Sequence, residues 1–505
     1  MGDSIVARKI LLMSEPLCSA PPCHRYRILA SLACLFALSA CSLVPAYTRP
    51  DVRPDAPRAT QFDGAAQTTP TSLADTIPVR SEWWRAYGNP SLDAMVAGSL
   101  QHNFSLASAV AAVEQARGNA ERAGAPLYPS VSLGATYDRS HSGGSGGQKG
   151  STGKSQSVFA QAGYEVDFWG FNAANANAAA LLARASEFDR DTVALTLTAS
   201  VVNTYFQVQS LRRRLMLAQT ISADASRILQ LLLAQQEAGV ATELQIQQQR
   251  NALATFQAAV PVLQLQLDQN LHALAVLTGN APEQFNVDDA QLSAIPIPMA
   301  RPELPSSLLE IRPDIRSKEA TLQSANFSVG AARAAFFPNL VLTANGGLSS
   351  GSLTHFLSSP LASIAASLAA PIFDGGALSG QLHTNRAAVA KGVADYRQTV
   401  VTALQDVEDA LSAARQQQLA EVSDQAAADA AQKAATLAEA QYKFGTVDFL
   451  TVLDAQRTLY QAEDTLVQTR LLRLQASVGL FRAFGGGFGV TDSSAVASQS
   501  NPGNS

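Results

Sequence analysis

The feature that most constrains the fold of this chain is a turn between helices that occurs twice, with an offset of 206 residues. In each copy a helical stretch ends at a glycine, Gly239 or Gly445, which suits the left-handed position after a helix. Three residues later, Thr242 or Asp448 can cap the next helix. The match continues without a gap, so the sequence predicts an internal duplication and two tight helical hairpins.

An apolar stripe with a seven-residue period follows each turn. Such a period is typical of helices that supercoil left-handedly around a neighbour. The stripe consists of Ile246, Leu253, Val260, Leu267 and Leu274 in the first copy, and of Leu453, Tyr460, Val467, Leu474 and Phe481 in the second. For a chain of 505 residues, a two-fold repeat favours one elongated body over several globular domains.

The lengths of the helical stretches predict two rods. Long helices are expected over residues 172–237 and 378–444, roughly 100 Å each at a rise of 1.5 Å per residue. In the first half, two shorter helices at 91–123 and 242–277 together match the long one. We expect them to stack end to end beside it.

Ahead of each long helix the pattern changes to strict alternation. Apolar residues from Val131 to Tyr137 and from Val158 to Phe168 alternate with small or polar ones, and the second half repeats this. A period of two with one apolar and one polar face predicts a β-hairpin in each half, at about 130–168 and 339–373. The first hairpin is expected to have a Gly/Ser loop at 140–157.

The N-terminal forty residues resemble a bacterial lipoprotein signal peptide. Arg25 and Arg27 precede an apolar run that is too short for a transmembrane helix and ends in Leu38-Ser39-Ala40-Cys41. We expect Cys41 to become the N-terminus and to carry diacylglycerol and an N-acyl chain. Ser42 favours sorting to the outer membrane. The alternative is an unmodified buried cysteine.

The composition argues against several other classes. The remaining cysteines precede Cys41, so the processed chain can form no internal disulfide or thiolate metal site. With a net charge of −5 and no basic patch among aromatics, nucleic acid is not expected as a partner. Gly143–Gly147 fits a nucleophile motif only formally, because no helix follows and no general base is nearby. We expect no enzymatic activity, no metal and no other cofactor.

Alternating strands of about ten residues in a secreted lipoprotein match a transmembrane β-barrel better than a globular sheet. One chain supplies only four strands, whereas bacterial barrels have eight or more, so the barrel must be shared between chains. The expected fold class is therefore an α+β membrane protein. Residues 42–80 show no periodicity and are rich in Pro, Thr and Asp, which predicts an extended linker.

Several short motifs, in their order along residues 81–487, resemble the TolC-like outer membrane efflux factors. The resemblance is to the lipoprotein branch that serves resistance-nodulation-division (RND) pumps. The motifs are Trp83-Trp84 with Asn89-Pro90-x-Leu92, Tyr164 to Gly170, Arg312-Pro313-Asp314-Ile315, Phe337-Pro338, Ile372 to Gly376, and Phe449 to Arg457. The resemblance implies a homotrimer with a twelve-stranded barrel in the outer membrane and a twelve-helix tunnel in the periplasm.

The resemblance also divides the chain. The expected parts are a signal peptide (1–40), a lipidated N-terminus and linker (41–90), a first repeat (91–279), an equatorial linker (280–307), a second repeat (308–487) and a tail (488–505). The implied function is passive export of drugs and other small amphiphiles, delivered by an inner-membrane RND pump through a periplasmic adaptor. The alternatives are a duct for metal-ion efflux or type I protein secretion, or a non-channel coiled-coil scaffold lipoprotein in the periplasm.

The resemblance maps the residues that close the tunnel onto Tyr442, Leu450, Asp454 and Arg457. Asp454 and Arg457 are three residues apart on one helix, so one can pair within the chain while the other reaches a neighbour. The alternative is a solvated surface pair worth under about 1 kcal/mol. The helical-tip turns are expected to contact the adaptor; their key residues are Gly239, Thr242, Gly445 and Asp448.

Overall fold

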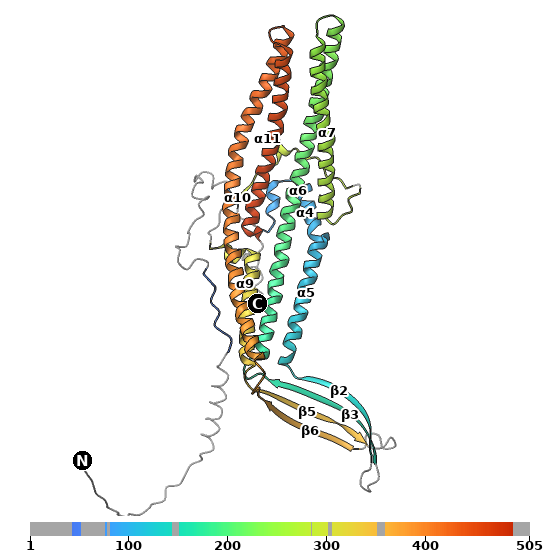
Figure 1. Ribbon diagram of the computed structural model, residues 1–505, viewed down its shortest axis with the longest axis vertical. Coiled ribbons are helices and arrows are strands. Elements are labelled where there is room, and N and C mark those ends of the chain that lie inside the picture. Colours follow the sequence, from blue (N-terminus) through green and yellow to red (C-terminus); the bar gives the residue numbers. More distant parts are fainter. Residues whose placement is uncertain are drawn as a thin grey trace, which may run out of the picture.

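The computed structural model describes residues 43–51, 76–77, 81–143, 151–283, 285–300, 306–350 and 359–487. These residues form a long helical body with a sheet at one end and two helical turns at the other (Figure 1). Cys41 and the tail at 488–505 lie outside the described residues.

The two halves contain the same main elements in the same order. The first half has α4 (Pro90–His102), α5 (Phe104–Gly124), η2 (Ala125–Leu127), β2 (Ser130–Ser142), β3 (Ser151–Val166), α6 (Phe171–Glu237) and α7 (Glu243–Leu277). The second half has α8 (Leu308–Ile311), α9 (Pro313–Ala334), β5 (Asn339–Ser350), β6 (Ser359–Ala369), α10 (Ala377–Lys443) and α11 (Phe449–Ala483). Both long helices have 67 residues and both returning helices have 35, as the sequence predicts to within two residues.

The helix predicted over 91–123 is wrong in one respect, because it is broken at Asn103. Asn103 has an extended backbone, and its side chain accepts hydrogen bonds from the amides of Ser105 and Leu106. Asparagine favours this capping role over a helix interior. Its amide group also donates to the carbonyl of Leu277 at 3.0 Å, which ties the break to the end of α7.

The predicted end-to-end stacking in the first half is confirmed. Helices α5 and α7 both pack along α6, as Figure 1 shows. Where they meet, Gly279 has a φ of +76°, and a Cβ there would lie 2.3 Å from the carbonyl oxygen of His102. Only glycine therefore fits this junction.

The four long strands form one antiparallel sheet in the order β2-β3-β5-β6. The first hairpin is longer than its predicted loop allows, since β2 and β3 remain paired as far as Ser142 and Ser151. Backbone pairing continues there because the ladder does not require apolar side chains. At the other end, β3 and β6 stop at Val166 and Ala369, before the predicted limits of 168 and 373.

Segments from the linkers pack against the middle of the body. The 3-10 helix η1 (Trp83–Tyr87) inserts its aromatic rings, with Trp83 stacked on Phe481 at 5.2 Å. Strand β1 (Thr76–Ile77) pairs in parallel with β4 (Met299–Ala300), and η3 (Leu292–Ala294) lies between α7 and β4. The predicted linker at 42–80 is thus wrong where it is described, because both 43–51 and β1 contact the body. The chain passes from α11 into a last short element, η5 (Gly485–Gly487).

The helices form a curved row in which α6 is central. It packs against α5 and α7 on one side and against α9 and α11 on the other, whereas α10 packs mainly on α9 and α11. Among the described residues, no helix combines the length and the apolar character needed to cross a membrane.

Candidate functional site

The two turns at the tip of the helical body have the same geometry. Gly239 and Gly445 take φ values of +74° and +71°, in the left-handed region that glycine tolerates. The amide of Val240 donates to the carbonyl of Gln235 at 2.8 Å, and the amide of Thr446 donates to that of Gln441 at 3.0 Å. The predicted glycine turns are confirmed, and their hydrogen bonds are equivalent.

The caps that follow the turns differ chemically. Thr242 forms a capping box, in which its hydroxyl accepts from the amide of Gln245 and the Gln245 side chain accepts from the amide of Thr242. The carboxylate of Asp448 accepts from the amide of Thr451 at 2.9 Å and from its hydroxyl at 2.6 Å. These hydrogen bonds from Thr451 hold the pKa of Asp448 below its usual value. One tip therefore has a neutral cap and the other an ionised one.

The four residues predicted to close a tunnel lie near the second turn. Leu450, Asp454 and Arg457 share one exposed face of α11, while Val452, Leu453 and Gln456 face inward. Tyr442 lies apart from them and packs edge-on against Phe449, with ring centroids 5.7 Å apart.

The pairing expected for Asp454 and Arg457 stays a prediction, because it includes a neighbouring helix. Within the described part of the chain, neither side chain forms an ion pair or hydrogen bond, although the two are three residues apart. Both point into solvent, beside Leu450, whose surface is 55% exposed. The stripe Leu450–Asp454–Arg457 is thus unpartnered within one protomer.

An apolar cluster joins the two helix pairs near the tip. Phe449 and Leu453 of α11 pack with residues of α6 and α7, and Tyr460 meets the ring of Phe256 edge-on at 5.8 Å. Below this cluster, Arg214 of α6 pairs with Asp464 of α11 at 2.7 Å. These contacts hold α11 against the first half, so an outward movement of α11 would have to break them.

A second ionic contact lies at the level of the linker segments that pack against the middle of the body. The carboxylate of Glu421 on α10 accepts from Arg470 at 2.9 Å and from Arg473, both on α11. Arg470 also donates to the carbonyl of Ile295 at 2.7 Å. Burial alone would raise the pKa of Glu421, but the two guanidinium groups lower it below its usual value.

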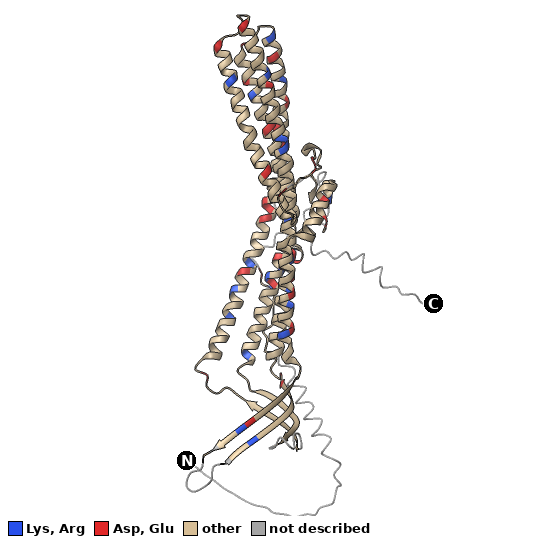
Figure 2. Ribbon diagram, turned by 90° about the vertical axis from the view of Figure 1, so that its right-hand side faces the viewer, with Lys and Arg blue, Asp and Glu red and all other residues tan. Residues whose placement is uncertain are grey.

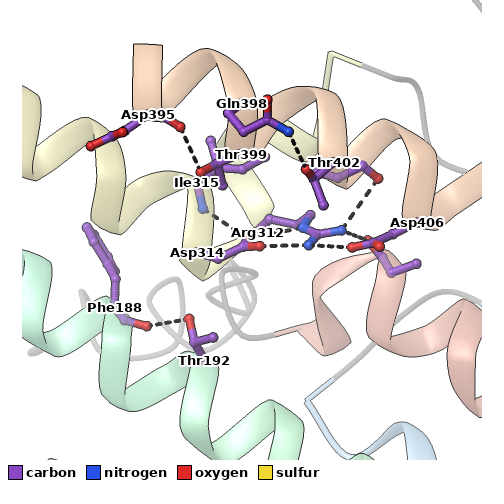
Figure 3. Close-up of polar contacts among 12 residues, drawn as sticks. Phe188, Thr192, Arg312, Asp314, Ile315, Asp395, Gln398, Thr399, Thr402 and Asp406 are labelled. Atoms are coloured by element: carbon purple, nitrogen blue, oxygen red, sulfur yellow. Dashed lines mark hydrogen bonds and ion pairs between the residues drawn. The ribbon is translucent and has the colours of Figure 1, made fainter. Parts of the chain in front are cut away.

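The motif Arg312-Pro313-Asp314 forms a junction below these segments (Figure 3). Arg312 is buried and donates to Asp314 at 2.7 Å, to Asp406 of α10 at 3.0 Å and to the carbonyl of Ala483 at 3.2 Å. Although its burial alone would lower the pKa of Arg312, the two carboxylates raise it above the usual value. The motif therefore ties the start of α9 to α10 and to the end of α11.

The long-range ion pairs were not predictable from the sequence. Arg214 and Asp464 are 250 positions apart, and no local pattern marks either residue. Charged side chains of both signs are spread along the helices, as Figure 2 shows. No cluster of three or more His, Cys, Asp or Glu suited to a metal ion occurs among the residues that the structure describes.

The chain thus combines a helical rod with paired tip turns and a four-stranded antiparallel sheet with two open edges. Residues 96–280 and 304–486 match the family described as outer membrane efflux protein. The chain belongs to this family.

Relatives with known names support this family assignment. The chain is 37% identical over 433 residues to the pyoverdine export outer membrane protein OpmQ of Pseudomonas aeruginosa, covering 82% of this chain and 89% of OpmQ. It is 31% identical to the probable efflux pump outer membrane protein TtgC of Pseudomonas putida, covering 90% and 94%. The solved outer-membrane channel OprN superimposes with a TM-score of 0.79 at 27% identity, covering 89% of this chain and 100% of OprN.

These similarities establish the general function and the location of the protein. The protein is an outer membrane efflux channel component, located in the outer membrane with a long periplasmic part. Its family and structural neighbours are channel proteins.

Proposed function

We propose that the chain forms a homotrimer with a twelve-stranded barrel and a twelve-helix tunnel. The observation that carries this proposal is the sheet, in which β2 and β6 each pair on one side only. An open sheet edge is not tolerated in lipid, because its amides and carbonyls would lack partners. Pairing β6 of one protomer with β2 of the next removes every edge.

The helices support the same assembly. Helix α10 exposes Leu419, Val422 and Leu437, which recur on one side of the helix. A neighbouring protomer would cover such an apolar face. The equal lengths of the helices in the two halves support an internal repeat as the origin of the fold.

The proposed cargo is drugs and other small amphiphiles, conducted passively. OpmQ is named for pyoverdine export and TtgC as part of an efflux pump, and both names describe outer membrane components. We therefore propose an RND pump and a periplasmic adaptor as partners. The adaptor would contact the tip turns at Gly239, Thr242, Gly445 and Asp448. The protein would act without enzymatic activity and without a cofactor other than lipid on Cys41.

We place the resting gate at Leu450, Asp454 and Arg457, with Tyr442 supporting it from behind. The support is the unpartnered stripe, because three copies facing a common axis would bring its charges and leucines together. Each Asp454 could then accept hydrogen bonds from an Arg457 of a neighbour. Even a small interaction energy per contact would stabilise the closed state, since each contact occurs three times in the trimer.

The test is conductance of the purified protein in planar bilayers, with crosslinking to count subunits. Asp454→Ala with Arg457→Ala should raise resting conductance while the trimer persists. Arg250→Ala is the matched control, because it removes an exposed charge at the same level of α7. An unchanged conductance in a correctly assembled double variant would place the gate elsewhere. A wild-type protein that does not form trimers would refute the proposed assembly.

A further inference from the structure

The four-stranded sheet has one apolar face and one polar face. By the register of β2 with β3, Val131 and Leu133 share one face with Val158, while Ser132 and Ser157 lie on the other. The side chain of Leu133 is 79% exposed within one chain, as expected for a residue that contacts lipid. In the proposed barrel, the apolar face is therefore the one that meets the membrane.

The charged residues of the sheet are divided between these faces by sign. The four strands, as the structure describes them, contain Asp138, Arg139, Lys154 and Glu165. Arg139 and Lys154 lie on the apolar face, directly opposite each other in the register, whereas the two carboxylates lie on the polar face. In Figure 2 the charged residues of β2 and β3 are coloured on a sheet that is otherwise tan. The apolar face thus carries a pair of cations and no anion.

The pair Arg139–Lys154 has no partner of opposite charge. Both side chains are exposed, and neither forms an ion pair or hydrogen bond with any residue that the structure describes. Like charges directly opposite each other destabilise a sheet. The hairpin nevertheless stays paired beyond them, where Nδ1 of His141 lies 2.9 Å from the hydroxyl of Thr152. An anion bound between the two cations would remove their repulsion.

The position along β3 places the pair at the outer surface of the membrane. The periplasmic helices join the sheet at its opposite end, where β3 ends at Val166. Lys154 is twelve residues from Val166, or about 40 Å of strand, and a tilt of about 40° leaves about 30 Å across the membrane. The apolar band of such barrels is about 25 Å tall, so the pair lies just beyond it, among the lipid headgroups. Tyr137, on the same face and two residues before Arg139, occupies the place of an interfacial aromatic residue.

The second hairpin shows that the fold does not require charges at this level. Strands β5 and β6, together with residues 351–358 between them, contain no Lys, Arg, Asp or Glu. The cation pair is therefore a feature of the first hairpin alone and not of the duplicated unit. In the proposed trimer it would occur three times around the barrel.

We propose that Arg139 and Lys154 form a binding site for the phosphate groups of an outer-leaflet lipid. This inference rests on the proposed barrel. The outer leaflet of an outer membrane consists largely of a glycolipid whose lipid A headgroup is phosphorylated. A guanidinium can donate two parallel hydrogen bonds to one phosphate, and a neighbouring ammonium adds a compact positive charge. Bound lipid would hold the first hairpin at the membrane surface.

The main test measures the affinity of purified trimers for lipid A in detergent micelles by native mass spectrometry. Arg139→Gln should weaken binding about fivefold, and adding Lys154→Gln should bring the loss to about thirtyfold, as expected for one and two charges at an anionic surface. Arg213→Gln with Arg250→Gln, which removes two exposed cations from α6 and α7, is the matched control and should leave the affinity unchanged. Equal affinity of the Arg139/Lys154 variant and the wild type would overturn the proposal.

A second series identifies the bound group. Lipid A without its phosphates should bind the wild-type trimer as weakly as intact lipid A binds the double variant. Higher salt should weaken binding of intact lipid A to the wild type more than to the double variant, because exposed charges are screened. Inorganic phosphate at the same phosphate concentration should not compete. Competition by inorganic phosphate would show a site for free anions and overturn the assignment to lipid.

A depth measurement separates failure of this site from failure of the barrel. In vesicles with brominated acyl chains, a fluorophore on Ala135→Cys should be quenched, because Ala135 lies on the apolar face within the membrane. Protein without this cysteine supplies the background. Absence of quenching would refute the barrel itself. Quenching together with an unchanged affinity of the Arg139/Lys154 variant for lipid A would refute the headgroup site alone.

Discussion

The two long helices have the same length and the same place in their half, yet they are buried to very different degrees. Of 67 residues each, 25 are buried in α6 and 10 in α10. Most of those in α10 are alanines, whereas α6 buries Phe, Tyr, Leu and Val along its middle. Helix α6 is largely covered by contacts within the chain, whereas α10 leaves much more of its surface exposed, where the proposed trimer would place a neighbour. Equivalent position in a repeat does not imply equivalent environment.

The same contrast appears at single positions related by the offset of 206 residues. Glu421 and Arg473 form an ion pair between α10 and α11. Their counterparts, Leu215 and Leu267, are buried apolar residues between α6 and α7. One half uses hydrophobic burial where the other uses charge.

The largest effect is expected at the core of α6. Phe206 is fully buried and meets Tyr87 edge-on at 5.0 Å, so Phe206→Ala should destabilise the protomer by about 3–5 kcal/mol. Its counterpart Ser412 is exposed, and Ser412→Ala should stay within about 0.5 kcal/mol. Denaturant unfolding of detergent-solubilised protein measures both. Similar losses of stability in the two variants would contradict the inferred difference in burial between α6 and α10.

A smaller but still large effect is expected at Glu421. Glu421→Gln leaves two guanidinium groups without their carboxylate and should cost about 3 kcal/mol. Replacing Glu421 and Arg473 together by leucine copies the first half and should cost much less. Thermal unfolding compares the three proteins, and a double variant as unstable as the single one would contradict the analogy. Because the pKa of Glu421 is lowered on folding, its contribution is present above the usual Glu pKa and disappears as pH falls through the folded value.

The smallest expected effect is a difference in acid sensitivity between the caps of the two tip turns. The pKa of Asp448 is lowered by Thr451, so the α11 cap weakens as pH falls below about 4, while the hydroxyl of Thr242 does not titrate. Asp448→Asn should keep the cap and remove this dependence. Hydrogen exchange at the Thr451 amide measures the effect, and the Gln245 amide serves as the internal reference. Equal acid sensitivity of Thr451 in both proteins would refute this assignment.

The sequence was sufficient for the elements that depend on local chemistry. The glycine turns, both caps and the long helices follow from residue types and periods that act within a few positions. The break at Asn103 was missed because its capping bonds are weak signals inside a good helical pattern. The contact of residues 43–51 with the body was missed because their partners, such as Glu319, lie about 270 positions away. The partners of Asp454 and Arg457 stay a prediction, since no local pattern on one helix determines what a neighbouring helix brings to them.

The sheet leaves β2 and β6 with one open edge each, and its apolar side chains include Ile364, which is 90% exposed. An open edge is a template for pairing with any other chain, which makes the newly exported protomer prone to aggregation. In the proposed trimer only neighbouring protomers remove the edges, so the lifetime of this vulnerable form would depend on protein concentration. We therefore expect the yield of assembled protein to rise cooperatively with the amount of chain synthesised. At low synthesis, degradation of single chains is favoured over insertion.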